Sequence, residues 1–395
     1  MHILLIHQAF AALDEAGGTR HIEMARHLAA SGHRVTIIAS PVSYLTGTAR
    51  SGRIPWIERQ ELAEGITLLR TYTLPALHKG FAARIFSFLS FMLSSLSAAL
   101  GVRQVDVVWG TTPPIFQAAT AWLAARLKGA RFLLEIRDLW PAFAIAVGVL
   151  RNPLLIRLSE WLERFLYRHA DRIMVNSPGF IQHIEARGGK DIRLIPNGVD
   201  PAMFEAEDGG AGFRQAHGLE GKFVALYAGA HGPSNDLDVL LEAARLLADL
   251  PEVRFLLVGD GKDKARLQAR AAELGLESVL FLPPVAKNGM AAVTAAADAG
   301  IAILKPIELY KTTYPNKVFD YMAAGKPVLL VIDGVIRALV EDAQAGVFCQ
   351  PGDPAALAEG IRRLAKDPAH AKSMGAAGKT YVQYHYNRIT LSAQL

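Results

Sequence analysis

The order of the apolar runs along this 395-residue chain is the feature that most restricts its fold. Short apolar runs alternate with longer stretches of helical periodicity, which is typical of parallel sheets covered by helices on both faces. Ten runs fit this pattern: HILLIH, RVTIIAS, DVVWG, RFLLEIR, RIMVN, KFVALYAG, VRFLLVG, VLFL, AGIAILK and PVLLVI. The sequence therefore predicts an α/β protein built from parallel sheets.

The series restarts after a turn-rich passage, IRLIPNGVDPAMF, near residue 200. A chain of this length exceeds one ordinary core and suits two domains. We therefore predict two Rossmann-like β/α/β domains, residues 1–197 and 198–378, that face each other across a cleft. Ligands of such sheets bind outside the carboxyl ends of the strands, so we expect the functional site in that cleft.

The cysteine content limits the chemistry and indicates a compartment. Cys349 is the only cysteine, which excludes an intramolecular disulfide and a metal site built from several cysteines. The first residues, MHILLIHQAF, lack the features of a signal peptide and fit a first strand better. We therefore expect the protein in a reducing cytoplasm.

Basic residues are concentrated in the first half of the chain. Residues 1–200 contain 22 Lys and Arg against 15 Asp and Glu, whereas the net charge of the whole chain is +5. Such a surplus suits an anionic partner such as a phosphate-bearing lipid or a membrane surface. Because no aromatic-basic cluster or zinc-finger spacing accompanies these residues, nucleic acid is not an expected partner.

Glycines follow strands at three places where a backbone could approach a ligand. Gly17 and Gly18 precede a helix in the first domain, although an ordinary flexible helix start explains them equally well. The other two loops lie in the second domain and hold Gly229, His231 and Gly232, and then Gly259 and Gly261. His231 could face a phosphate or could be a plain surface histidine. No G-x-G-x-x-G follows the first strand, so a dinucleotide fingerprint is excluded there.

The stretch KTTYPNKVFDYMAAGKPV predicts an anion site at the head of a short helix. Pro315 and Asn316 precede the helix, with Asn316 as the expected N-cap, and Lys317 and Val318 would present backbone amides at the positive end of the helix dipole. Lys317 adds a full charge, so a diphosphate could be neutralised without a metal ion. Asp320 could accept from the two hydroxyls of a ribose, or it could be an ordinary surface aspartate.

Five motifs in this order resemble those of glycosyltransferase family 4: GGTRHIEMARHLAASGHRV, LIPNGVDPAMF, the glycine loop after Tyr227, LLVGDG and PNKVFDYMAAGKPVLL. The stretch EIRDLWP is more narrowly similar to bacterial amino-sugar transferases of O-antigen and capsule assembly, of the L-fucosamine type. The resemblance covers nearly the whole chain. It implies a retaining, metal-independent enzyme with the GT-B fold, a UDP-sugar donor in the second domain and an acceptor in the first. It also implies that residues 379–395 cross back to the first domain.

The resemblance assigns roles to single residues, and two positions depart from the family pattern. Asp320 matches the second glutamate of the family's E-x7-E motif and would bind the ribose, whereas Thr312 stands where the first glutamate belongs. Glu308 is the candidate substitute for that acid. The basic pair usual in the loop after Tyr227 is also absent, so Lys317 would take over its charge. On the acceptor side, Asp138 of RDLWP is the predicted residue.

The stretch FAARIFSFLSFMLSSLSAAL, residues 81–100, is long enough to span a bilayer and contains one charge. Its serines recur along one helix face, and apolar residues supply the opposite side. These features favour a helix that lies in one leaflet of the membrane, and a buried core helix is the alternative. In the first case, the acceptor would be a polyprenyl-diphosphate-linked saccharide at the inner membrane face.

Two other functions fit parts of the same pattern. A degenerate, noncatalytic transferase that serves an active subunit would explain the absent glutamate and the absent basic pair. A UDP-sugar 2-epimerase with the same fold would need a carboxylate-rich site for proton transfer, which the sequence does not display.

Overall fold

The computed structural model describes residues 1–15, 17–43, 47–50, 54–76 and 80–395. The chain divides into two compact units. Unit 1 consists of residues 1–11, 18–196 and 392–395, and unit 2 consists of residues 12–17 and 197–391. The predicted domain boundary at residues 197 and 198 thus lies one residue from the main division. The segment 379–395, which was expected to cross back, divides between residues 391 and 392.

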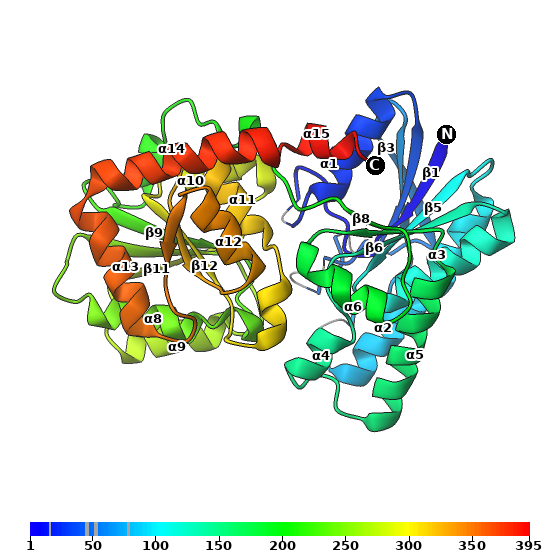
Figure 1. Cartoon of the computed structure of the whole chain (residues 1–395), viewed down its shortest axis with the longest axis horizontal. Helices are drawn as coiled ribbons and strands as arrows, with labels where there is room; N and C mark the ends of the chain where they lie inside the picture. The colour runs from blue at the N-terminus through cyan, green and yellow to red at the C-terminus, as the bar shows by residue number, and fades with distance from the viewer. Residues whose placement is uncertain (16, 44–46, 51–53, 77–79) are drawn as a thin grey trace. The chain divides into compact units, whose positions relative to one another are not determined.

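Unit 1 is built on a sheet of eight strands in the order β3-β4-β2-β1-β5-β6-β7-β8 (Figure 1). All neighbouring pairs are parallel except β3 and β4, which form an antiparallel pair at one edge. The strands are β1 (His2–Ile6), β2 (Arg34–Ala39), β3 (Ile57–Ala63), β4 (Ile66–Thr71), β5 (Val107–Thr112), β6 (Arg131–Ile136), β7 (Arg172–Val175) and β8 (Ile192–Leu194). The strand order reverses between β1 and β5, so ligands are expected beyond the carboxyl ends of these two strands.

Within the described part of unit 1, six helices connect or cover these strands. They are α1 (Arg20–Ala30), α2 (Phe81–Gly101), α3 (Ile115–Lys128), α4 (Ala142–Ala146), α5 (Pro153–His169) and α6 (Ile181–Ala186). Helix α3 packs on β5 and also contacts α2 and α5, so these three helices lie side by side. Among the described residues, only α2 is long and apolar enough to cross a membrane.

Unit 2 contains a six-stranded parallel sheet in the order β11-β10-β9-β12-β13-β14. This is the doubly wound order, with its switch point between β9 and β12. The strands are β9 (Phe223–Ala228), β10 (Val253–Val258), β11 (Val279–Leu282), β12 (Ala299–Ile303), β13 (Val328–Val331) and β14 (Gly346–Phe348). All ten predicted runs are strands, and the two parallel sheets confirm the predicted α/β class with two Rossmann-like domains.

Helices pack on both faces of the second sheet and enclose two apolar cores (Figure 1). One face carries α8 (Leu237–Leu246), α9 (Lys264–Glu273) and α13 (Pro354–Lys366). The other face carries α10 (Met290–Ala295), α11 (Asn316–Ala323) and α12 (Val335–Asp342). The remaining helices are α7 (Ala211–Ala216), α14 (Pro368–His385) and α15 (Arg388–Ser392). The central strands β9, β10, β12 and β13 are almost entirely buried, which explains their apolar runs, whereas the edge strands β11 and β14 are only partly buried.

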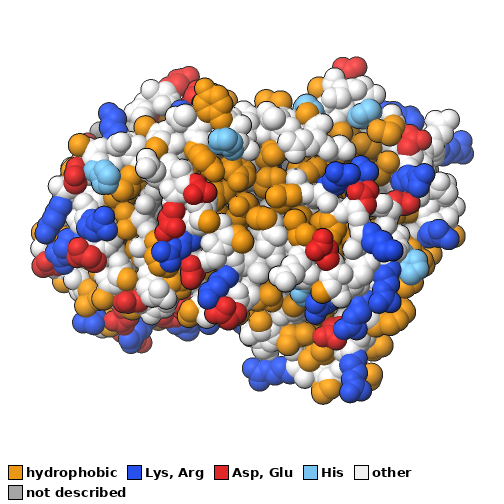
Figure 2. Space-filling view, in the orientation of Figure 1, with side chains coloured by type: hydrophobic (Ala, Val, Ile, Leu, Met, Phe, Trp, Pro, Cys, Tyr) orange, Lys and Arg blue, Asp and Glu red, His pale blue; other side chains and the backbone are white. Residues whose placement is uncertain are grey.

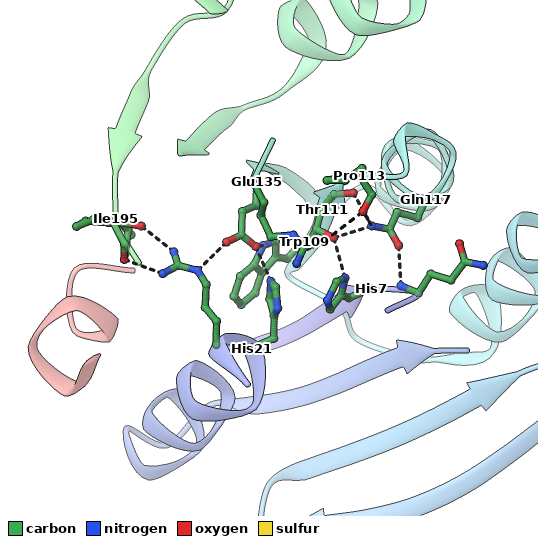
Figure 3. A network of polar contacts seen from close by, with 12 residues as sticks. His7, His21, Trp109, Thr111, Pro113, Gln117, Glu135 and Ile195 are labelled. Atoms are coloured by element: carbon green, nitrogen blue, oxygen red, sulfur yellow. Dashed lines mark hydrogen bonds and ion pairs between the residues drawn. The ribbon is translucent and has the colours of Figure 1, made fainter. Parts of the chain in front are cut away.

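A buried carboxylate joins α1 to the first sheet (Figure 3). Glu135, at the end of β6, is fully buried and accepts from Arg20 Nε at 2.9 Å, from His21 Nε2 at 2.7 Å and from Trp109 Nε1 at 3.1 Å. Burial alone would raise the pKa of Glu135, but His21 and the Arg20 guanidinium outweigh it and hold that pKa below its usual range. The carboxylate is therefore ionised and has three donors.

Arg20 also binds the last residues of the chain before it leaves unit 1. The two terminal nitrogens of Arg20 donate to the carbonyl oxygens of Pro196 and Ile195 at 2.8 and 2.7 Å. One side chain of α1 thus holds β6 and the last residues before the division between the units. Breaking such a buried pair on one side is costly because the partner charge remains without compensation.

We predict that Glu135→Gln lowers the free energy of unfolding of unit 1 by about 3–5 kcal/mol, because it leaves the Arg20 charge buried without a counter-charge. Urea denaturation followed by circular dichroism would measure this change. Glu160→Gln is the matched control: Glu160 pairs with Arg164 on the surface of α5 at 3.4 Å, and we expect a loss below about 1 kcal/mol. Equal midpoints for the two variants would contradict the prediction.

Candidate functional site

Two glycine loops meet beyond the carboxyl ends of β9 and β10, next to the switch point of the second sheet. Gly259, which follows β10, has a φ of 152°, and a Cβ there would lie 1.9 Å from the carbonyl oxygen of Gly229, which follows β9. A Cβ on Gly261 would lie 2.5 Å from the carbonyl oxygen of His231. Both positions therefore require glycine, because any side chain would separate the two loops. Gly232 differs, since its backbone is extended and a Cβ would have room.

His231 lies between these glycines and is fully buried. Neither ring nitrogen has a hydrogen-bond partner among the described residues. Burial, assisted by the positive charge of Lys264, lowers the pKa of His231 to about 4, so the ring is neutral near pH 7. A neutral imidazole always carries one N–H, and a buried donor without a partner is rare. The prediction that His231 faces a ligand is therefore favoured over a plain surface histidine.

Lys317 supplies a cation beside the first loop. Its Nζ lies 3.9 Å from the centre of the Tyr227 ring, and it would be 3.1 Å from a Cβ on Gly229. Removal from water lowers the pKa of Lys317 to about 7, and the nearby Asp320 charge offsets part of that effect. The ammonium thus has an aromatic neighbour but lacks a fully compensating anion, which leaves it free to bind one.

The head of α11 differs in detail from the expectation. The helix begins at Asn316, so Pro315 holds the capping position with extended ψ, and no side chain caps the helix. The prediction of Asn316 as N-cap was therefore wrong, because its backbone is already helical. The Val318 amide donates to the Pro315 carbonyl oxygen at 3.2 Å, and its side chain is in the core. Asn316 and Lys317 are thus the residues of the first turn that can present amides to an anion.

Asp320, the predicted ribose ligand, already has a partner. Lys287 Nζ lies 2.8 Å from Asp320 Oδ1 and 4.5 Å from the centre of the Phe204 ring. The ion pair is only partly exposed, so it is stronger than an ordinary surface pair. Lys287 was missed in the sequence because it lies 33 residues away, at the start of a short 3-10 helix, Lys287–Gly289, with no motif. It leaves the second oxygen of Asp320 available to a hydroxyl group.

Thr312 and Glu308 lie together on a short helical turn, Glu308–Thr312. The Glu308 side chain is 86% exposed and pairs with Lys311 at 2.7 Å. Thr312 Oγ1 donates to the Leu309 carbonyl oxygen at 2.6 Å. Among the described residues, Glu308 makes no hydrogen bond or ion pair with Lys317 or Asp320. The structure therefore brings Lys317, His231 and the glycine loops together, and leaves Glu308 on the surface.

The predicted residues of the first half lie at two places. Gly17, with a φ of 153°, and Gly18 precede α1, and a Cβ on Gly18 would meet open space. Asp138 follows β6, two residues beyond the end of that strand. Burial raises the pKa of Asp138 to about 6, against the opposing charge of Arg137. A carboxyl group with this pKa is mostly ionised near neutral pH and can accept a proton or a hydrogen bond.

The second-unit cluster can bind a phosphate-like anion. It combines a lysine, a neutral histidine with a free N–H and the uncapped first turn of α11. Lys264 Nζ stabilises the loop after β10 by donating to the carbonyl oxygens of Gly259 and Leu282 at 2.7 and 3.0 Å. Sequence reasoning missed Lys264, although its place in GDGKDKARL was a usable signal. Within the described residues, no group of three or more His, Cys, Asp or Glu could hold a metal ion.

Family models match most of the chain. Residues 17–198 match the "Glycosyl transferase 4-like domain" model, and residues 212–381 match the "Glycosyl transferases group 1" model. The second match contains every residue of the anion-binding cluster.

Individual proteins show the same similarity. WcaI of Escherichia coli K12, named as a colanic acid biosynthesis glycosyl transferase, is 26% identical over 88% of this chain and 88% of its own length. The glycosyltransferase WbjE of Pseudomonas aeruginosa is 26% identical over 77% of this chain and 76% of its own. The structure of Anabaena HepE in complex with UDP and glucose superposes with a TM-score of 0.73 at 18% identity, over 100% of this chain and 98% of HepE. HepE therefore shares the fold.

We predict that anion binding at this cluster weakens above neutral pH, because Lys317 has a pKa of about 7 and must be protonated to bind an anion. With UDP as the test anion, whose phosphate is fully ionised in this range, affinity will fall about ten-fold between about pH 8 and about pH 9. Isothermal titration calorimetry measures the affinity at each pH.

The control for this prediction is Lys317→Arg, since a guanidinium keeps its charge in this range. Its affinity for UDP will change little with pH. A fall of equal size in both proteins would show that Lys317 is not the titrating group.

Proposed function

The chain is a glycosyltransferase, with a glycosyl transferase 4-like domain followed by a group 1 domain, and we propose that it moves a sugar from a UDP-sugar to a lipid-linked saccharide. The sugar moved is an N-acetylated amino sugar, and the acceptor is a polyprenyl-diphosphate-linked saccharide of a bacterial surface polysaccharide such as O-antigen or capsule. The name of WcaI and the similarity of EIRDLWP to amino-sugar transferases support this assignment.

The observation that carries the proposal is the anion cluster around Lys317 and His231. A leaving nucleoside diphosphate needs donors and positive charge where its own charge develops, and these groups are already in place before the ligand binds. The HepE complex with UDP supports uridine as the nucleoside. Asp320 would accept from the ribose hydroxyls through the oxygen that Lys287 leaves available. The charge of Lys317 also removes the need for a metal ion, so we expect turnover without one.

The reaction that we propose retains the configuration at the anomeric carbon. The bond between this carbon and the diphosphate oxygen breaks, and the acceptor hydroxyl oxygen forms the new bond from the same face. The proton of that hydroxyl passes to the departing phosphate oxygen, so no protein nucleophile is needed. The protein then acts by stabilising the diphosphate and by positioning the acceptor, for which Asp138 is the candidate in the first domain.

The lipid-linked acceptor implies that the enzyme works at a membrane. We propose that it is a peripheral protein on the inner face of the cytoplasmic membrane, with α2 as the interfacial helix. The basic surplus of residues 1–200 supports contact with an anionic lipid surface.

A second candidate is a noncatalytic partner of an active transferase. Thr312 stands at the position of the family's first glutamate, and Glu308 is exposed and paired with Lys311 rather than joined to the cluster. These observations favour a protein that binds the nucleotide without turning it over.

The decisive assay incubates the protein with a panel of UDP-sugars and a polyprenyl-diphosphate-linked saccharide. We expect a lengthened saccharide, which mass spectrometry detects, and the same rate with a metal chelator present. Binding of UDP without product would favour the noncatalytic partner. An isomerised UDP-sugar would favour the 2-epimerase.

We further predict that Lys317→Ala lowers turnover about 10²–10³-fold at saturating donor and leaves the fold intact, because the leaving diphosphate loses a preorganised cation. Steady-state kinetics and circular dichroism test both parts. Lys372→Ala, on the exposed side of α14, is the matched control and should turn over normally. Near-normal turnover by Lys317→Ala would remove this assignment.

A further inference from the structure

We propose that α2 and α5 of unit 1 together form a docking face for an anionic lipid bilayer, and that both helices lie flat on it. This inference rests on the proposed function, which needs a membrane, and adds the surface that would contact it. The docking face consists of the exposed apolar side chains of the two helices: Phe86, Leu89, Leu93 and Leu100 of α2, and Leu154, Leu158 and Trp161 of α5.

Helix α2 has its polar side turned inward. Ser87, Ser94 and Ser95 are fully buried, Ser94 Oγ donates to the Tyr72 carbonyl oxygen at 2.6 Å, and Ser90 Oγ accepts from the Leu74 amide at 2.9 Å. Of the serine seam expected from the sequence, Ser87, Ser90 and Ser94 thus belong to the contact with the rest of unit 1, whereas Ser97 is exposed.

The outward side of α2 is mainly apolar instead, with one exposed serine, Ser97, between Leu93 and Leu100. The exposed fractions of Phe86, Leu89, Leu93 and Leu100 are 62%, 40%, 68% and 49%. These positions recur every three, four and seven residues and therefore form one stripe along the helix. A surface helix of a soluble protein has the opposite arrangement, with its apolar side turned to the core. The exposed stripe therefore calls for an apolar partner.

Helix α5 also has a stripe of exposed apolar side chains. Leu154, Leu158 and Trp161 are 65%, 53% and 60% exposed, and their spacing of four and three residues places them on one side. Trp161 stacks on Phe165 with ring centres 5.5 Å apart, so its ring is held in place. Helix α3 lies between α2 and α5 and adds Leu127, which is 60% exposed. Three neighbouring helices thus expose apolar residues.

The charges around the docking face select the kind of partner. Helices α2, α3 and α5 contain six basic residues and two acidic ones, and one of the acids, Glu163, is buried against Arg187 and His183. Figure 2 shows basic and hydrophobic side chains interleaved over α5. The basic residues are Arg84, Arg126, Lys128, Arg157, Arg164 and Arg168. Apolar residues flanked by arginines match the interface of a bilayer with anionic headgroups.

The packing of α2 also distinguishes an interfacial orientation from a membrane-spanning one. Residues 83–101 could cross a membrane by length and composition alone. Crossing would break the bonds of Ser90 and Ser94 to Leu74 and Tyr72 and expose these polar groups to lipid. Lying flat keeps the bonds and buries only the outer stripe. The geometry therefore favours an interfacial helix over a spanning one.

Flotation with vesicles of phosphatidylcholine and phosphatidylglycerol in equal parts tests the docking face, using the full chain without donor or acceptor. We expect the protein to float with these vesicles, less so at high salt, and weakly with phosphatidylcholine alone. Leu93→Asp on α2 and Leu158→Asp on α5 should each reduce the partition coefficient about ten-fold or more, because each puts a charge where an exposed leucine would enter the bilayer.

Leu246→Asp is the matched control, since this leucine is 41% exposed on α8 of unit 2. It should float like the wild type. All three positions are exposed, so circular dichroism should show intact folds. Failure of the wild type to float would overturn the proposal, as would normal flotation of both docking-face variants. Size-exclusion chromatography with light scattering tests whether a second copy of the chain occupies the docking face instead. If the wild type is a dimer and either variant is a monomer, the docking face is a dimer interface and the membrane proposal is wrong.

Transfer to a water-soluble acceptor analogue, measured with the same proteins, separates this inference from the proposed function. Equal transfer by the wild type and the docking-face variants, together with lost flotation of the variants, supports the docking face. Normal transfer by a wild type that does not float overturns the docking face alone and leaves the transferase function standing.

Discussion

The buried carboxylate of Glu135 is the interaction on which the arrangement of unit 1 depends. An ionised group with no contact to water must find several donors, and it obtains them from Arg20, His21 and Trp109 on α1 and β5. These hydrogen bonds hold α1 against the sheet. Arg20 also donates to the carbonyl oxygens of residues 195 and 196 and so holds this segment in place. The carboxyl ends of β1, β5 and β6, where an acceptor is expected, are therefore held by one charge.

In unit 2 the corresponding constraint is steric rather than ionic. The loops after β9 and β10 touch through backbone atoms, so Gly259 and Gly261 cannot carry side chains. This contact places His231 beside the head of α11, where Lys317 rests on the Tyr227 ring. A cation with a depressed pKa and a neutral imidazole without a partner form a site that is complete only when an anion binds. Such preorganisation is what departure of a diphosphate requires.

Local patterns predicted the parts of this site that lie within one segment of chain. The glycine loops and the lysine at the head of α11 could be read directly, because backbone approach and helix ends leave clear signatures. The ion pair between Lys287 and Asp320 could not, since its partners are far apart in sequence. The Asn316 cap was wrong by one position because Pro315 already supplies the extended residue. Strands β3 and β4 were missed, and exposed, charged residues fill β3, which is the edge strand of the pair.

The sequence by itself determined the α/β class, the ten apolar strands and the membership of a glycosyltransferase family, because each depends on periodicity or on residues close together in the chain. Only the tertiary structure decided which side of α2 faces the protein. The serines form a polar seam in either case, and Ser90 and Ser94 turn inward because Leu74 and Tyr72 offer backbone groups that need partners, whereas Ser97 stays exposed. This orientation of α2 leaves Phe86 and three leucines exposed to solvent. Of the two roles that the sequence allowed, interfacial helix or buried core helix, the exposed apolar side favours the first.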